Sequence, residues 1–287
     1  MSAVPDIRAE LGLRPDQSLE LLKALHILTR DGRINQDSRR KLKQVNHLTQ
    51  FLAPLLTPLL QGGEALTLVD HGAGKSYFGF MLYDRFFQTA PQAAVYGIET
   101  RAPLVASAQA LAKQIGFERM HFLPLSAAAA ITSPDLPPTV NIVTALHACN
   151  TATDEAIDFA LAKQAQIVML VPCCQAEVAA CLNQHKQAQL KQPLTEIWRH
   201  PLHTREFGSH LTNVLRCLRL EAHGYHVTVT ELVGLDHAMK NELIIAEQRQ
   251  QPSRRAANRL ARLLAEFGLT DLRVRFAIPQ GADDGEG

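Results

Sequence analysis

Residues 66–76 read Leu-Thr-Leu-Val-Asp-His-Gly-Ala-Gly-Lys-Ser, a mostly apolar run that ends on an acid and then passes two glycines. Residues 66–69 are typical of a buried parallel strand. From Tyr77 onward, large apolar side chains recur at helical spacing, so the glycines fall at a strand-to-helix turn. Backbone N–H groups at the start of a helix have no partner within the helix and can bind an anion or a polar ligand. The stretch therefore predicts an α/β fold with a ligand-binding loop at this turn.

Two cofactors suit a loop of this kind. Gly74-Lys75-Ser76 resembles the end of a phosphate-binding P-loop, but that loop has a glycine five positions before the Gly-Lys pair, where this chain has Val69. Asp70 followed by the two turn glycines favours a methyl-donor site for S-adenosyl-L-methionine instead. We predict the donor as the cofactor.

The next apolar run, residues 94–98, also ends on an acid, Glu99. In dinucleotide-binding folds an acid at this place hydrogen-bonds a ribose diol, and we expect the same role for Glu99. The alternative is a glycine-rich turn with an incidental acid, because short glycine motifs also occur by chance. The expected cofactor-binding residues are Asp70, Gly72, Ala73, Gly74, Lys75, Ser76, Glu99, Leu146 and His147.

Composition places few other limits on the chain. Its 287 residues, 46% hydrophobic with a net charge of +1, suffice for a full α/β core and a smaller appendage. Five cysteines form no regular framework and residues 1–6 lack the pattern of a secretory signal, which predicts a cytoplasmic protein. The longest apolar stretch, residues 51–60, is too short to cross a bilayer and holds two prolines, so no membrane segment is predicted.

Strand and helix patterns alternate from residue 66 onward, which predicts a parallel sheet with crossover helices. Two late strands close together predict an antiparallel pair at the sheet edge, the usual ending of a class I methyltransferase domain. The expected strands are 66–70, 95–99, 120–123, 140–146, 166–171, 225–233 and 241–246, with a further strand at 272–278. The expected helices are 18–29, 36–51, 77–87, 102–115, 154–162, 176–184, 209–223 and 253–267, with a polar link before residue 209 and disorder at 281–287.

Basic side chains gather before the first strand and again near the C-terminus. They form either a solvated helix face or a phosphate-binding patch. Because the total charge is near neutral, any nucleic-acid partner would have to be held by such local patches. The N-terminal group is Arg30, Arg33, Arg39, Arg40, Lys41 and Lys43, against Asp31 and Asp37, and the C-terminal group is Arg254, Arg255, Arg259 and Arg262.

Two further segments fall where a doubly wound sheet binds ligands, at the carboxyl ends of its strands. Residues 146–154 read Leu-His-Ala-Cys-Asn-Thr-Ala-Thr-Asp, with Thr151 or Thr153 as the expected N-cap of a helix, and residues 171–175 read Val-Pro-Cys-Cys-Gln. Since both follow adjacent strands, their thiols are expected to converge. The candidate catalytic residues are His147, Cys149, Asn150, Asp154, Cys173 and Cys174.

These segments, with Asp-x-Gly-x-Gly-Lys-Ser at 70–76 and Asp-His-Ala-Met-Lys-Asn at 236–241, resemble bacterial members of a class I S-adenosylmethionine-dependent methyltransferase family. That family is similar in its cysteine segments to eukaryotic tRNA 2′-O-methyltransferases. The resemblance covers about residues 41–247 and implies methyl transfer, with RNA as the acceptor. Gln175 stands where the tRNA enzymes have a histidine, and their zinc-finger cysteine clusters are absent.

The resemblance implies a Rossmann-like α/β fold with a mainly parallel seven-stranded sheet and an N-terminal helical cap. We expect the cap at 1–60, the S-adenosylmethionine-binding domain at 61–250, and a C-terminal extension at 251–287. A small-molecule or protein acceptor stays open, as does a non-catalytic module that binds S-adenosylmethionine or RNA.

The roles of the cysteines and of His147 stay open at this point. The thiols suit covalent catalysis, although the Asp-x-Pro-Cys form of the cytosine C5 enzymes is absent. They suit zinc binding less well because adjacent cysteines are poorly spaced for one tetrahedral site, and we predict no metal. They also suit simple packing beneath the cofactor. His147 is either a general base or a residue that ties two loops together. His237, Lys240 and Asn241 are further candidates for the acceptor side.

Overall fold

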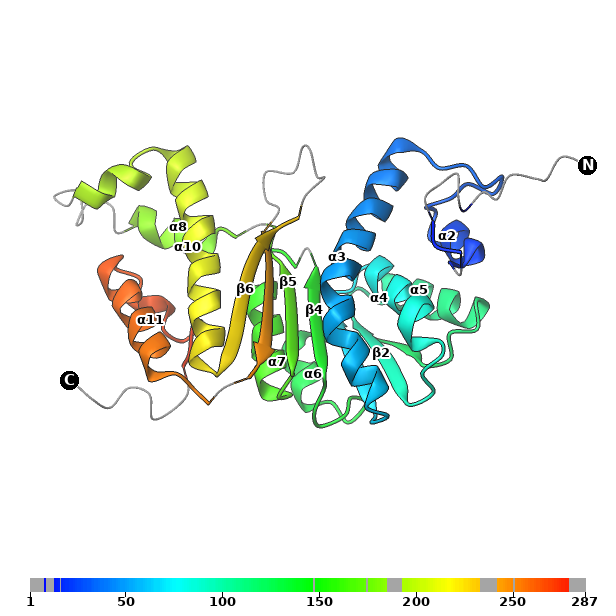
Figure 1. Cartoon of the computed structure of the whole chain (residues 1–287). Helices are drawn as coiled ribbons and strands as arrows, with labels where there is room; N and C mark the ends of the chain where they lie inside the picture. The colour runs from blue at the N-terminus through cyan, green and yellow to red at the C-terminus, as the bar shows by residue number, and fades with distance from the viewer. Residues whose placement is uncertain are drawn as a thin grey trace, which may run out of the picture. The chain divides into compact units, whose positions relative to one another are not determined.

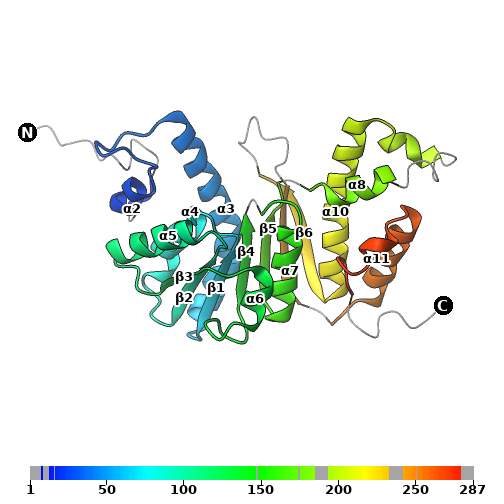
Figure 2. The ribbon, with the colours of Figure 1, turned by 180° about the vertical axis from the view of Figure 1, so that it is seen from behind.

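The computed structural model describes residues 8, 13–15, 17–146, 148–173, 175–184, 193–232, 242–249 and 251–278. Its seven strands form one mainly parallel sheet with helices, the Rossmann-like architecture that the sequence predicts (Figures 1 and 2). The chain divides into two units, residues 1–126 with 232–241, and residues 127–231 with 242–287. The boundaries expected at residues 60 and 250 stay a prediction.

The first unit contains three parallel strands in the order β3-β2-β1. β1 and β2 are short, mostly apolar and largely buried on both faces, as parallel strands are, whereas His121 of the edge strand β3 is exposed. The register places Asp70 beside Gly97, so the ends of β1 and β2 lie level. The elements are β1 (Leu66–His71), α4 (Tyr77–Leu82), the π-helix η1 (Tyr83–Phe87), β2 (Ala93–Ile98), α5 (Ala102–Gln114) and β3 (Met120–Leu123).

Two helices precede β1, and both differ in length from the prediction. Helix α2 (Leu19–Ala24) ends early because His26 has φ 56°, which turns the chain away from the helix. Helix α3 (Gln36–Gln61) continues through Pro54 and Pro58, although proline removes a helical N–H donor. Leu52 and Leu56, one turn apart, are fully buried there, and this packing outweighs the lost hydrogen bonds.

The second unit contains four strands in the order β4-β5-β7-β6. β4 and β5 are parallel, whereas β7 runs antiparallel to both β5 and β6, which confirms the predicted antiparallel pair. Helix α10 packs against β6, α8 and α11 (Figures 1 and 2). The elements are α6 (Ala127–Thr132), β4 (Ile142–Leu146), α7 (Ala152–Ala162), β5 (Ile167–Val171), α8 (Glu177–Gln184), the 3-10 helix η2 (Pro193–Trp198), α10 (Pro201–Ala222), β6 (Tyr225–Glu231), β7 (Glu242–Gln248), α11 (Arg254–Glu266) and the 3-10 helix η3 (Thr270–Leu272).

Two expectations for this unit are wrong. The polar link expected before residue 209 is helical, because α10 begins at Pro201, and proline suits the first turn of a helix. The strand expected at 272–278 is a 3-10 helix followed by turns. Its apolar pattern reflects two buried side chains, Leu272 and Phe276, which belong to one hydrophobic cluster with Leu260 and Leu264 of α11. Residues 281–287 lie outside the described part of the chain.

Among the residues that the structure describes, no helix is both long enough and apolar enough to cross a membrane.

Candidate functional site

The loop between β1 and α4 is a tight turn whose backbone explains its glycines. Gly72 and Gly74 have φ of 67° and 57°, which side-chain-bearing residues rarely adopt. The N–H of Ala73 donates to the Ile98 carbonyl at 2.9 Å, and the N–H of Ser76 donates to the Ala73 carbonyl at 2.6 Å. The turn is therefore fixed to the end of β2.

Asp70 is buried at the end of β1 and holds the far side of this loop. Its Oδ2 accepts a hydrogen bond from Ser76 Oγ at 2.8 Å. Ser76 has φ 48°, an unusual value for a residue with a side chain, and this bond helps to stabilise it. A Cβ on Gly79 would lie 2.4 Å from Ser76 Oγ, so the glycine allows α4 to approach the pair.

Glu99, directly after β2, accepts hydrogen bonds from both the loop and the start of α5. Its Oε2 lies 2.9 Å from the Gly74 N–H and 2.9 Å from Arg101 Nη2. Its Oε1 accepts from the N–H and the Nε of Arg101 at 3.0 and 2.9 Å. Side-chain hydrogen bonding from Arg101 lowers the pKa of Glu99 to about 2, so the carboxylate is ionised. Arg101 was not predicted from the sequence, where only its proximity to Glu99 in the chain could have indicated it.

His71 follows Asp70 and is also buried. Burial lowers the pKa of His71 to about 4, against the opposing effect of the Glu99 charge. The imidazole is therefore neutral at physiological pH.

This burial predicts a pH dependence of stability. The folded pKa of His71 lies below the unfolded value near 6.5, so between those values the unfolded chain takes up a proton that the folded chain does not. We expect the free energy of unfolding to fall by up to about 1.4 kcal/mol per pH unit as the pH drops from about 6.5 to 4. Urea unfolding across this range tests it, and His71→Asn should lack this part of the slope. The same slope in His71→Asn would contradict the assignment.

In the second unit, the loops after β4 and β5 lie together, as the sequence predicts. The Sγ atoms of Cys149 and Cys173 are 3.5 Å apart, and the Cys149 side chain is exposed. Asn150, at φ 52°, accepts a hydrogen bond on Oδ1 from the Ala176 N–H at 3.2 Å. Two side-chain contacts thus join these loops.

The start of α7 is held from inside rather than by its expected cap. Thr151 occupies the N-cap position, but its side chain makes no capping hydrogen bond. Thr153 Oγ1 instead donates to the Ala148 carbonyl at 2.7 Å. Thr151 is therefore the N-cap residue, as one of the two predicted positions, but it makes no capping hydrogen bond, and Thr153 lies inside the first turn of α7.

Asp154 forms a buried ion pair with Arg216 of α10. Arg216 Nε and Nη2 donate to its two carboxylate oxygens at 2.8 and 2.6 Å, and Arg216 is 0% exposed. Arg216 Nη2 also donates to the Asn150 carbonyl at 2.9 Å. One guanidinium therefore connects α10, α7 and the loop after β4.

The same network continues to β5 and β7. Gln175 Nε2 donates to Asn213 Oδ1 at 2.7 Å, and Asn213 Nδ2 donates to Glu242 Oε2 at 2.7 Å. Gln175 Nε2 also lies 3.2 Å from the Ser209 carbonyl. Gln175, which stands where the tRNA enzymes have a histidine, is thus part of a buried polar network that the sequence did not reveal.

Several predicted residues lie outside the described part of the chain: His147, Cys174, His237, Lys240 and Asn241. Leu146 is the half-buried last residue of β4. Lys75 is exposed in the loop after β1. Within the described ranges, no group of three or more His, Cys, Asp or Glu side chains is placed to hold a metal ion.

Comparisons with known proteins agree on one kind of domain. Residues 40–181 match a family model described as a methyltransferase domain. No curated protein sequence matches the chain.

Many solved structures are similar to the chain, and three illustrate the range. Magnesium protoporphyrin IX methyltransferase (ChlM) from Synechocystis PCC 6803 with bound SAH is 14% identical, with 80% of this chain and 93% of that chain covered and a TM-score of 0.45. A SAM-dependent methyltransferase from Aquifex aeolicus is 17% identical, with 67% and 89% covered and a TM-score of 0.39. An rRNA methylase from Streptococcus thermophilus is 11% identical, with 65% and 89% covered and a TM-score of 0.38.

Proposed function

We propose that this chain, a class I S-adenosylmethionine-dependent methyltransferase, methylates RNA. S-adenosyl-L-methionine is its cofactor. The observation that carries the RNA proposal is the exposed, largely unpaired group of basic side chains before β1. The loop between β1 and α4 supports the assignment of the residues that hold the methyl donor.

The loop fits a methyl donor because of its charge and its backbone. Glu99 is ionised and lies at the end of a parallel strand, which suits hydrogen bonds from a ribose diol. Gly72 and Gly74 bring the loop backbone close to a ligand without side chains in the way. We assign the donor to Gly72, Ala73, Gly74 and Glu99, and we assign Asp70 and Ser76 to holding the loop in shape.

S-adenosylmethionine supplies a methyl group already activated on a sulfonium. In-line transfer from it depends mainly on the proximity and orientation of the acceptor, so the protein's chief task is to position two ligands. The fixed turn after β1 suits the positioning of the methyl donor.

On the acceptor side, the candidate residues divide by their contacts. Asp154 is part of the buried network, and the exposed Asn150 side chain accepts a hydrogen bond from the Ala176 N–H in the loop after β5, so we assign both residues positioning roles. Cys149 is exposed and lies next to Cys173, so its thiol is open to an acceptor. We retain His147 and Cys174 as candidates on the sequence alone.

The basic group before β1 supports an RNA acceptor. Arg33 and Arg40 lie near Asp31 and Asp37, at 4.0 and 3.6 Å. The other basic side chains of the group are exposed, and none makes a salt bridge to another described residue: Arg30, Arg39, Lys41 and Lys43. Unpaired exposed cations attract a phosphate backbone, and their pairing releases counterions. In the C-terminal group, Arg259 pairs with Glu221 at 3.4 Å, so that group contributes less free charge.

A labelling experiment tests this function. Tritiated S-adenosylmethionine and the purified protein should label bulk RNA from a deletion strain, but not RNA from the wild type, whose sites are already methylated. The Arg39→Ala/Lys43→Ala variant should label more slowly and show a smaller salt dependence of RNA binding, by roughly 0.7 in the log–log slope per lost contact. Labelling of protein or small molecules without RNA would overturn the RNA assignment, and no transfer at all would favour a binding module.

A further inference from the structure

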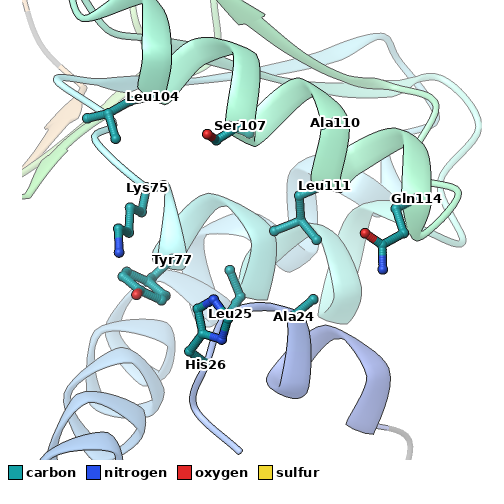
Figure 3. A pocket seen from close by; sticks show the side chains of 11 residues that line it. Ala24, Leu25, His26, Lys75, Tyr77, Leu104, Ser107, Ala110, Leu111 and Gln114 are labelled. Atoms are coloured by element: carbon teal, nitrogen blue, oxygen red, sulfur yellow. The ribbon is translucent and has the colours of Figure 1, made fainter. Parts of the chain in front are cut away.

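A cavity of about 580 Å³ lies within the first unit, and Lys75 of the loop after β1 is part of its lining (Figure 3). The end of α2 with the two residues after it, the start of α4 and α5 line it, and it is open to solvent. Its volume is that of a site for a small organic group. Its lining residues are Ala24, Leu25, His26, Lys75, Tyr77, Leu104, Ser107, Ala108, Ala110, Leu111 and Gln114.

The lining combines an apolar floor with two rings and a cation. Figure 3 shows the side chains of Lys75, Tyr77 and His26 gathered at one end of the cavity, with Leu111 facing them from α5. Lys41 adds a second cation, since its Nζ lies 5.7 Å from the centre of the Tyr77 ring. None of the lining residues is acidic. This chemistry suits a planar ring that carries a negative charge.

The walls of the cavity are held in place by specific contacts. The Ser18 N–H donates to Asp84 Oδ2 at 3.4 Å, and Arg14 pairs with the same carboxylate at 3.8 Å, which ties α2 to the helix after α4. His26 itself has φ 56°, an unusual backbone conformation that presents its ring at the end of α2. Such conformations often occur at ligand-binding positions.

We propose that this cavity binds one unpaired nucleotide of the RNA acceptor. The base lies against the His26 and Tyr77 rings, and the phosphate pairs with Lys75 and Lys41. Proteins recognise unpaired bases by stacking on aromatic rings within a cationic surface, and the exposed Arg30, Arg39 and Lys43 provide that surface here. The inference rests on the proposed RNA function and names the part of the RNA that this unit binds.

The cavity is separate from the donor-binding residues. Asp70 and Glu99 are not part of its lining, and only Lys75 belongs to the loop after β1. A nucleotide bound here contacts the donor loop through Lys75.

A tryptophan at Ser107 tests the proposal. Ser107 is exposed on α5 and lines the cavity, so Ser107→Trp fills the space that the base needs. Ala106→Trp is the matched control, because Ala106 is exposed on the same helix but outside the lining. For a short single-stranded RNA, fluorescence anisotropy should give a Kd roughly 10-fold to 100-fold higher in Ser107→Trp, the loss expected for one stacked base. Ala106→Trp should bind RNA like the wild type, and calorimetry should give equal S-adenosylmethionine affinity for all three proteins.

Photo-crosslinking gives an independent readout. RNA substituted with 5-iodouridine should crosslink to peptides that contain Tyr77 or His26 in the wild type and in Ala106→Trp, but not in Ser107→Trp. If the wild type binds RNA and Ser107→Trp binds it equally well, the cavity assignment is overturned and the RNA function stands. If free mononucleotides occupy the cavity but the Kd for RNA is the same in Ser107→Trp and in the wild type, the assignment to RNA is likewise overturned. If the wild type has no affinity for RNA, the proposed function itself fails.

Discussion

Replacing Asp154 with alanine is expected to lower the free energy of unfolding by about 3–5 kcal/mol. Asp154 and Arg216 are both almost fully buried, and the guanidinium donates to both oxygens of the carboxylate. Removing the carboxylate leaves a buried positive charge without its counter-ion, which is far less favourable than losing an exposed pair. Chemical denaturation monitored by circular dichroism measures the change. Methyl transfer should fall as well, since Arg216 also holds the Asn150 carbonyl in the loop after β4.

Two further variants separate charge burial from loss of packing. Glu196→Ala removes one partner of an exposed ion pair, with Arg199 at 3.1 Å, and should change stability by less than about 1 kcal/mol. The double variant Asp154→Leu/Arg216→Met removes both charges and should be more stable than Asp154→Ala alone, because no unpaired charge stays buried. An Asp154→Ala protein as stable as Glu196→Ala would show that water reaches the pair.

The sequence predicts this fold well where local signals are strong. The ends of β1 and β2, at His71 and Ile98, lie within one residue of the expected ends at Asp70 and Glu99, and β3 matches its expected bounds of Met120 to Leu123. The glycines of the loop after β1 could be predicted because a tight strand-to-helix turn needs positive φ.

The polar network of the second unit could not be predicted in the same way. Arg216 lies 62 residues from Asp154 in the chain, and in the sequence it is one of several charged residues on an amphipathic helix. Only the packing of α10 shows that it is buried. Likewise, Pro54 and Pro58 argue against a helix locally, and only the burial of Leu52 and Leu56 explains why α3 continues. Tertiary packing decides these features.

Replacing Glu99 with alanine is expected to raise the Kd for S-adenosylmethionine roughly 100-fold, because each charge-assisted hydrogen bond contributes about 1.5–3 kcal/mol. Isothermal titration calorimetry measures the Kd. The pKa of Glu99 is lowered to about 2, so the carboxylate is charged at every pH above that value, and the ribose contact should not weaken between pH 8 and pH 5. Glu99→Gln keeps an acceptor for the Gly74 N–H and should bind more tightly than Glu99→Ala. Unchanged affinity in Glu99→Ala would remove Glu99 from the donor site.

Arg101 supplies the control that makes this test specific. Its side chain is 66% exposed and donates two hydrogen bonds to the Glu99 carboxylate, which has about four acceptor positions in all. A ribose diol needs acceptors of the same carboxylate, so the exposed guanidinium must give way while the bond from the Gly74 N–H stays. We therefore expect Arg101→Ala to bind the donor as tightly as the wild type or more tightly. If Arg101→Ala weakened binding as much as Glu99→Ala does, the guanidinium would be orienting Glu99 rather than competing with the ribose.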